Sequence, residues 1–226
     1  VEKTDEALAI IACNYFENPS EKLILVGVTG TNGKSTTVTL LYELFTRLGY
    51  KTGLLSTIRN IIGNNILAST HTTPDPISLN ALLARMVDEG CTYAFMEVSS
   101  HAIHQKRIAG LKFAGGIFTN LTHDHLDYHK TFSDYIKAKK EFFDKLPETA
   151  FALVNKDDPN GIVMLQNCHA KKYNYSLSSM ADFKAKVIEN SISGIQLEIE
   201  GNQVFTRLVG RFNAYNILVV YATARL

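Results

Sequence analysis

The residues best suited to chemistry lie in the stretch GVTGTNGKSTT at positions 27–37. Its glycines let the backbone approach a triphosphate closely, because no side chain stands in the way. The backbone N–H groups of such a loop, together with the N-terminus of a following helix, attract anions. Lys34 adds a positive charge there, and Ser35 offers a hydroxyl to the Mg²⁺ that accompanies the nucleotide. The stretch therefore predicts a binding loop for a nucleoside triphosphate.

This loop departs from the strict P-loop pattern at one position. The glycine expected five residues before Gly33 is Val28, and glycines stand at 27 and 30 instead. An ordinary glycine-rich turn is the alternative interpretation. We favour a variant phosphate-binding loop, because the apolar run 23–26, the Gly-Lys-Ser sequence and a helical pattern occur in the required order.

Polar residues follow two further apolar runs of the chain. Glu97 lies near the end of the run 93–98, and Asn120 follows the run 113–118. Ligands of parallel sheets bind beyond the carboxyl ends of the strands, so a carboxylate there is the expected second ligand of Mg²⁺. A helix cap or a salt bridge is the alternative role for Glu97.

The sequence HDHLDYH at 123–129 raises the question of a metal other than magnesium. His125 and His129 have the four-residue spacing of zinc ligands on a helix. No third residue suited to zinc lies nearby in the sequence, and a magnesium–nucleotide site already accounts for a metal. We therefore favour a loop with one functional histidine, and a metal-dependent hydrolase stays open as an alternative.

Residues 133–146 have the pattern of an amphipathic helix, with one lysine on its apolar face. At about 100° per residue, Lys139 lies about 40° from Tyr135, in the middle of that face. The apolar face comprises Tyr135, Ile136, Phe142, Phe143 and Leu146, and the solvated face Lys137, Lys140, Glu141 and Asp144. A lysine in this position snorkels, pairs with an anion or has a function. Carbamylation by CO₂, which would make it an anionic metal ligand, is a further interpretation.

The composition of the chain limits the fold class and the kinds of partner that we expect. With 226 residues, of which 46% are hydrophobic, the chain can bury the core of one large α/β domain. A net charge of +1 gives no basic field for nucleic acid. Three cysteines in apolar surroundings predict buried thiols in a reducing compartment, and no apolar run approaches a membrane span. We expect a soluble, cytoplasmic protein.

Strand and helix patterns alternate along most of the sequence. Strands are predicted at 23–26, 51–57, 93–98, 113–118 and 151–154, with a hairpin in 58–69. Helices are predicted at 5–16, 35–48, 77–87 and 133–146, after a cap at Asp157/Asp158-Pro159, and from Asn213 onward. This predicts an α/β fold of P-loop type, a mostly parallel sheet with helices on both faces. We divide it into an N-terminal helix and linker (1–20), the core (21–170), a small antiparallel meander (171–210) and a closing helix (211–226).

Five motifs together resemble the Mur ligases of peptidoglycan synthesis: GVTGTNGKSTT, HTTPDP, MEVSSHA, TNLTHDHLDYH and the Tyr135-x-x-x-Lys139 helix. The greatest similarity is to the MurE-type branch, which adds the third residue to UDP-N-acetylmuramoyl-L-alanyl-D-glutamate. The resemblance covers essentially residues 1–226 and implies the central ATP-binding domain of a three-domain enzyme. The flanking UDP-binding and C-terminal domains are absent from this sequence, so we expect the isolated domain to be inactive.

The resemblance also implies roles for individual residues. ATP phosphates would contact Gly30, Thr31, Asn32, Gly33, Lys34, Ser35 and Thr36, with Asn120, Asn213 and Asn216 on the nucleotide side. One Mg²⁺ would bind Ser35 and Glu97, and a second metal His125 and Lys139, the latter similar to the family's carbamylated lysine. The muramoyl-peptide substrate would contact Thr72, Thr73, Ser99, Gln105 and Arg107. Lys34, Glu97, His125 and Lys139 are the implied catalytic residues.

Structural roles stand beside several of these assignments. Asp75 of HTTPDP is suited to capping a helix, Arg107 to the surface, and the two C-terminal asparagines to capping the last helix. Phe212 replaces the histidine common in the family's motif, and Ser35 replaces a threonine found in many relatives. His101 and His104 receive no role.

The expected reaction is ATP-dependent amide ligation through an acyl phosphate. The implied partners are the UDP-N-acetylmuramoyl dipeptide and an amino acid such as meso-diaminopimelate or L-lysine, with a monomer as the expected state. Folylpolyglutamate synthetases and cyanophycin-type ligases share the GTNGK loop and remain alternatives. A nucleotide-dependent binding module without ligase activity is another.

Overall fold

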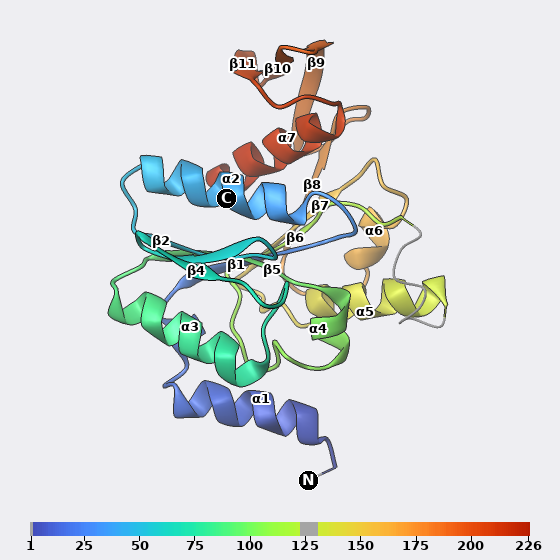
Figure 1. The fold of residues 1–226 in the computed structure, drawn as a ribbon. Helices are drawn as coiled ribbons and strands as arrows, with labels where there is room; N and C mark the ends of the chain where they lie inside the picture. Colours follow the sequence, from blue (N-terminus) through green and yellow to red (C-terminus); the bar gives the residue numbers. More distant parts are fainter. Residues whose placement is uncertain (1, 123–130) are drawn as a thin grey trace.

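The computed structural model describes residues 2–122 and 131–226, which form an 11-stranded sheet flanked by helices (Figure 1). The strand order is β11-β10-β9-β8-β7-β6-β1-β5-β2-β3-β4. The strands are β1 (Ile24–Thr29), β2 (Thr52–Leu55), β3 (Arg59–Ile62), β4 (Asn65–Ala68), β5 (Tyr93–Glu97), β6 (Gly115–Phe118), β7 (Phe151–Asn155), β8 (Lys171–Ser176), β9 (Phe183–Ser191), β10 (Gly194–Ile199) and β11 (Asn202–Thr206). The helices are α1 (Thr4–Tyr15), α2 (Lys34–Arg47), α3 (Pro76–Asp88), α4 (Ser100–His104), α5 (Phe132–Asp144), α6 (Gly161–Met164) and α7 (Phe212–Arg225), with a 3-10 turn η1 (Pro19–Glu21).

Strand β1 lies at the centre of the parallel part of the sheet. It pairs in parallel with β5 on one side and with β6 on the other. Its side chains alternate between two cores: Leu25 packs with residues of α3 and α5, whereas Val26 and Val28 pack with residues of α2 and α7. Helices therefore cover both faces of the sheet, which confirms the predicted α/β class (Figure 1). The predicted hairpin is also present, as antiparallel β3 and β4.

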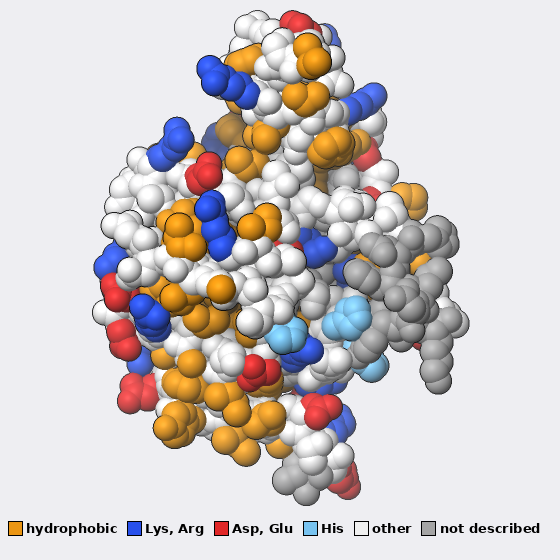
Figure 2. Space-filling view, in the orientation of Figure 1, with side chains coloured by type: hydrophobic (Ala, Val, Ile, Leu, Met, Phe, Trp, Pro, Cys, Tyr) orange, Lys and Arg blue, Asp and Glu red, His pale blue; other side chains and the backbone are white. Residues whose placement is uncertain are grey.

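The C-terminal strands differ from the prediction in one respect. The antiparallel meander predicted for 171–210 begins later, because β8 pairs in parallel with both β7 and β9. The antiparallel pairs are β9–β10 and β10–β11. Strand β8 begins with polar residues, so the sequence had no apolar run that would predict a core strand here. Tyr175, near the end of this strand, is nevertheless fully buried. Figure 2 shows hydrophobic side chains exposed on the lobe that β9–β11 form at one end of the sheet.

The helix predicted after Asp157/Asp158-Pro159 is the short α6, and its capping differs from the prediction. Asn160 is the residue before the helix, and no side chain caps it. The Asp157 carboxylate instead accepts hydrogen bonds from the backbone N–H groups of Leu177 and Ser178. One oxygen of Asp158 accepts from the backbone N–H of Leu121. Asp157 therefore connects loops at the carboxyl edge of the sheet, whereas Asp158 does so with one oxygen and accepts with the other from the backbone N–H of Asn160, just before α6.

Cys13, Cys91 and Cys168 are free and buried, as predicted. Burial raises the pKa of each thiol above its ordinary value. In the described parts of the chain, no helix combines the length and the apolar character that crossing a bilayer requires.

Candidate nucleotide and substrate site

The glycine loop connects the carboxyl end of β1 to the first turn of α2. Gly30 and Gly33 have φ values of +148° and +86°, which L side chains rarely adopt. A Cβ atom on Gly30 would lie 1.9 Å from Thr119 Oγ1, so the loop also has no room for one. Gly33 precedes α2 and brings no side chain to cap it, which leaves the first N–H groups of this helix suited to an anion.

Asn120 holds the loop in shape from the end of the neighbouring strand. Its side-chain oxygen accepts a hydrogen bond from the backbone N–H of Asn32 at 3.0 Å, and its amide donates to the Asn32 carbonyl at 3.1 Å. Its backbone carbonyl accepts from the N–H of Thr31 at 2.8 Å. The sequence predicted a nucleotide-side position for Asn120, and the structure also gives this residue a clear role in positioning the loop.

A cavity of about 800 Å³ lies on one side of the loop. This volume is within the range of small-molecule sites. It is lined by Asn32, Gly33, Thr36, Thr119, Asn120, Asn155, Asp157, Asp158, Pro159, Tyr175, Arg211, Phe212, Tyr215 and Asn216. We call it the nucleotide-side cavity. Asn32, Gly33, Thr36, Asn120 and Asn216 are the sequence-predicted nucleotide contacts that line it.

The two C-terminal asparagines act as a pair. Asn216 lines the nucleotide-side cavity, and its amide donates a hydrogen bond to Asn213 Oδ1 at 2.9 Å. The amide of Asn213 donates to the Val209 carbonyl at 2.8 Å, and Asn213 is not among the lining residues. Asn213 therefore orients Asn216, whose side chain lies against Gly33.

Asp157 is a polar residue of this cavity that the sequence reasoning had treated only as a helix cap. It accepts hydrogen bonds from Ser176 Oγ at 2.6 Å and from the Tyr215 hydroxyl at 3.0 Å. Burial alone would raise the pKa of this carboxyl, but hydrogen bonds from Ser176, Leu177 and Tyr215 outweigh it and lower the pKa. The same arrangement raises the pKa of Tyr215, through burial first and then through its bond to Asp157.

Lys34 and Lys139 meet at the carbonyl oxygen of Gly30. Lys34 Nζ donates to this oxygen at 2.9 Å and to the Thr31 carbonyl at 2.8 Å, and Lys139 Nζ donates to the Gly30 oxygen at 3.1 Å. Lys139 is 1% exposed, so the prediction that it lies on the buried face is confirmed and snorkelling is wrong. The positive charge of Lys34 at this point of the loop favours a polyanion there.

Glu97 ends β5 beside Val28 of β1 and is 1% exposed. The backbone N–H of Thr57 donates to Glu97 Oε1 at 2.8 Å, and the Thr57 hydroxyl donates to Oε2 at 3.2 Å. No lysine or arginine of the described residues forms a salt bridge with it, and its role as a metal ligand stays a prediction. Sequence reasoning missed Thr57, which lies 40 positions away in the chain.

A second cavity, of about 310 Å³, lies on the other side of the loop. It is lined by Gly30, Lys34, His71, Thr72, Thr73, Ser99, Ser100, His101, Arg107 and Lys139. We call it the substrate-side cavity, because four of the five predicted substrate contacts line it. Gln105, the fifth, lines an adjacent cavity together with Arg107.

Hydrogen bonds connect the predicted substrate residues to one another. Arg107 Nη1 donates to the Thr73 carbonyl at 2.8 Å, and Nε and Nη2 donate to Gln105 Oε1 at 2.9 and 2.6 Å. Thr73 Oγ1 donates to the Glu97 carbonyl at 2.8 Å and accepts from the N–H of Ser99 at 3.1 Å. The alternative of Arg107 as a simple surface residue is therefore wrong.

Asp75 has the capping role that the sequence suggested, and Ser99 has a capping role that sequence reasoning missed. Asp75 caps α3 by accepting hydrogen bonds from the N–H groups of Ile77 and Ser78. Ser99 caps α4 through its hydroxyl, which accepts from the N–H of Ala102.

His125 lies outside the described residues, as does the rest of HDHLDYH. The predictions that rest on this segment therefore stay predictions. Elsewhere, in residues 2–122 and 131–226, no group of three His, Cys, Asp or Glu side chains is arranged to hold a metal ion. Ser35, in the first turn of α2, lines neither of the two cavities named above.

Together, the parallel sheet, the glycine loop between β1 and α2, and the cavities at the carboxyl ends of the strands define a nucleotide-binding α/β domain of P-loop type. Residues 28–224 match the family described as the Mur ligase middle domain. The chain therefore belongs to that family, as the five motifs predicted.

Two named proteins and one solved structure show which members of this family the chain is similar to. The chain is 64% identical over 226 residues to the UDP-N-acetylmuramoyl-L-alanyl-D-glutamate–2,6-diaminopimelate ligase of Cytophaga hutchinsonii, covering 100% of this chain and 46% of that protein. It is 59% identical to the enzyme of the same name from Phocaeicola vulgatus, covering 100% and 47%. A solved structure of a ligase with this name superposes with a TM-score of 0.82 at 27% identity, covering 97% of this chain and 47% of that one. The chain thus spans about half the length of these relatives.

Proposed function

We propose that this chain is the central ATP-binding part of a ligase that joins 2,6-diaminopimelate to UDP-N-acetylmuramoyl-L-alanyl-D-glutamate. The observation that carries the proposal is the position of the loop between two cavities. Asn32 and Gly33 line the nucleotide-side cavity, whereas Gly30 and Lys34 line the substrate-side cavity. A phosphoryl group bound to this loop would therefore face both compartments. The identity to the named ligases supports the choice of substrates.

The proposed reaction has two steps. A carboxylate oxygen of the dipeptide substrate attacks the γ-phosphorus of ATP, the bond to the β-phosphate oxygen breaks, and ADP leaves with that electron pair. The amine of the second substrate then attacks the carbonyl carbon of the acyl phosphate, inorganic phosphate leaves, and the nitrogen loses a proton. Such transfer asks the protein mainly for positioning and for positive charge around the phosphoryl oxygens. Lys34 and Arg107 supply that charge in the substrate-side cavity.

The residues present are suited to magnesium. Glu97 provides a buried carboxylate whose orientation Thr57 fixes, and Ser35 provides a hydroxyl on the first turn of α2. These are oxygen ligands, which Mg²⁺ prefers. When bound, Mg²⁺ neutralises charge on the phosphate oxygens. We also propose that a second metal would bind His125 and Lys139 in carbamylated form, on the similarity of the Tyr135-x-x-x-Lys139 helix to the family's motif.

The test uses the full-length protein that contains these residues. Phosphate release from Mg-ATP is measured with the UDP-linked dipeptide and a panel of amines that includes 2,6-diaminopimelate and L-lysine. We expect release to require the dipeptide and one amine, with 2,6-diaminopimelate preferred. Release that requires a folate substrate instead would favour the folylpolyglutamate-type alternative. Release without either substrate would indicate a plain nucleotidase and contradict the proposal. The monomeric state and the cytoplasmic location stay predictions.

A further inference from the structure

The turn after α4 carries two of the proposed substrate residues on either side of an unusual one. Gln105, Lys106 and Arg107 follow α4, and Lys106 has a φ of +56°. The N–H of Lys106 donates to the carbonyl of Ile103, and the N–H of Arg107 donates to the carbonyl of Ala102. This is the helix ending in which the residue at the position of Lys106 is usually glycine. A residue other than glycine keeps this left-handed backbone conformation only where its surroundings stabilise it.

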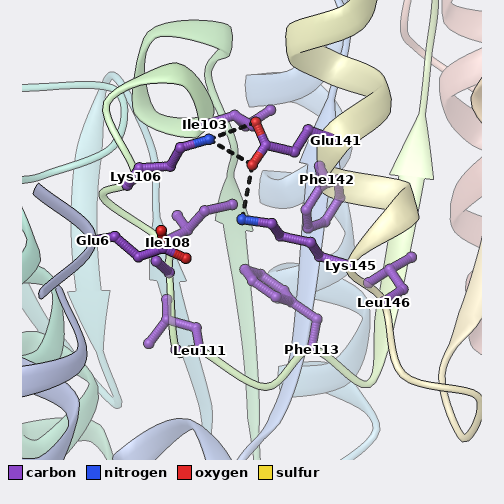
Figure 3. A pocket seen from close by; sticks show the side chains of 12 residues that line it. Glu6, Ile103, Lys106, Ile108, Leu111, Phe113, Glu141, Phe142, Lys145 and Leu146 are labelled. Carbon is purple, nitrogen blue, oxygen red and sulfur yellow. Dashed lines mark hydrogen bonds and ion pairs between the residues drawn. The ribbon is translucent and has the colours of Figure 1, made fainter. Parts of the chain in front are cut away.

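Arg107 lines the substrate-side cavity and Gln105 lines the adjacent one, whereas Lys106 points to α5. Arg107 donates hydrogen bonds to Gln105 and to the Thr73 carbonyl, as described above. Lys106 Nζ reaches the carboxylate of Glu141 at 2.6 and 2.7 Å (Figure 3). Glu141 was predicted to lie on the solvated face of its helix, but its side chain is only 30% exposed and that of Lys106 only 28%.

Glu141 joins this turn to the helix that bears Lys139. Lys145, the residue that follows α5, contacts the same carboxylate at 2.8 Å (Figure 3). The Glu141 carboxylate therefore receives two lysines, one from the turn after α4 and one from the end of α5.

The packing beneath the turn is incomplete. A cavity of about 300 Å³ lies between this turn, α1 and α5, and Lys106, Glu141 and Lys145 line it together with Ile103, Phe113 and Phe142 (Figure 3). A hollow removes the close contacts that otherwise fix a backbone conformation. The ion pair from Lys106 to Glu141 joins the turn to α5, in addition to the packing of α4 against α5.

We infer that the Lys106–Glu141 ion pair positions Arg107 for the muramoyl-peptide substrate and sets its distance from Lys139. The inference rests on the proposed function above. Lys106 and Glu141 are positioning residues that act through the turn and do not contact the substrate. Both Arg107 and Lys139 line the substrate-side cavity, one on the turn and the other on α5, so a contact between these elements fixes the two side chains relative to each other.

The test compares variants of the full-length protein. Lys106→Ala and Glu141→Gln remove the pair, Lys106→Arg retains it, and Lys145→Ala is a matched control, because it removes the other lysine of the same carboxylate. We expect Lys106→Ala and Glu141→Gln each to raise the KM for the UDP-linked dipeptide about tenfold, which corresponds to about 1.4 kcal/mol. The KM for ATP should stay within about twofold. Lys106→Arg and Lys145→Ala should behave as wild type. The double variant Lys106→Ala/Glu141→Gln should raise this KM no more than either single variant does, because both substitutions remove the same contact.

Amide hydrogen exchange of residues 102–109 provides a readout that does not depend on activity. We expect faster exchange there in Lys106→Ala and Glu141→Gln than in wild type and Lys145→Ala. Unchanged exchange and an unchanged KM in folded variants would overturn the inference, as would an equal effect of Lys145→Ala. An inactive wild type would refute the proposed function, and the exchange comparison would still decide whether the pair holds the turn.

Discussion

Replacement of Thr57 by valine tests whether the candidate magnesium ligand depends on a hydrogen bond from a distant loop. The substitution keeps the shape of the side chain and removes its hydroxyl. The hydroxyl donates to Glu97 Oε2 at 3.2 Å and also lies 3.0 Å from the Thr72 hydroxyl, a contact that the substitution removes as well; the backbone N–H of Thr57 still donates to Oε1. One of two contacts to a buried carboxylate is therefore lost, and the other holds only one of its oxygens.

The size of the expected effect on Mg²⁺ binding follows from the charge of the Glu97 carboxylate, which accepts this hydrogen bond. A hydrogen bond to a charged group contributes about 1.5–3 kcal/mol, and the 3.2 Å length of this bond favours the lower end. About 1.5 kcal/mol corresponds to roughly tenfold in a binding constant. Loss of a residue that orients a metal ligand typically weakens metal affinity by about 10–100-fold, which agrees with this value.

The assay is a magnesium titration of ATP binding to the full-length protein by calorimetry. We expect Thr57→Val to shift the Mg²⁺ midpoint upward about tenfold. Thr57→Ser, which retains the hydroxyl, is the control and should titrate as wild type. An unchanged midpoint in Thr57→Val would refute the role of this contact. An equal shift in Thr57→Ser would attribute the effect to packing rather than to the hydrogen bond.

Three further predictions follow from the same geometry. Lys34→Ala should abolish Mg-ATP binding in calorimetry, because Lys34 is the cation of the glycine loop; unchanged affinity would refute the phosphate-binding assignment. Lys139→Ala should abolish phosphate release in the full-length protein, with partial rescue by short carboxylic acids, whereas full activity would mean that this buried lysine has only a structural role. Since the pKa of Asp157 is lowered, its contribution to stability is present above its ordinary pKa and is lost as the pH falls through the lowered value. Urea unfolding at acidic pH should therefore show a steeper loss of stability in wild type than in Asp157→Asn, and equal slopes would contradict this.

Local patterns in the sequence predicted much of the fold and part of the site. Helical periodicity placed Lys139 on the buried face of α5, and the glycines at 30 and 33 marked the loop that a side chain would fill. The helix cap at Asp75 was also recognisable, since its partners are the next residues in the chain. These features depend on residues close in the sequence, so their spacing is informative.

The features that were missed depend on contacts between distant residues. Thr57 meets Glu97 only because β2 and β5 are adjacent in the sheet, and Asp157 meets Tyr215 only because α7 packs near β8. The polar residues at the start of β8 did not indicate that this strand pairs in parallel within the sheet. Lys106 gave no signal either, because a positive φ at a lysine cannot be recognised from residue type.

The most direct test of the central claim follows one oxygen atom through the reaction. The reacting carboxylate of the UDP-linked dipeptide is labelled with ¹⁸O, and the full-length protein is supplied with Mg-ATP and 2,6-diaminopimelate. Transfer of the γ-phosphoryl group to this carboxylate predicts that the released phosphate carries one ¹⁸O atom from the substrate. Unlabelled phosphate, with amide product formed, would contradict an acyl phosphate and the role proposed for the loop between the two cavities.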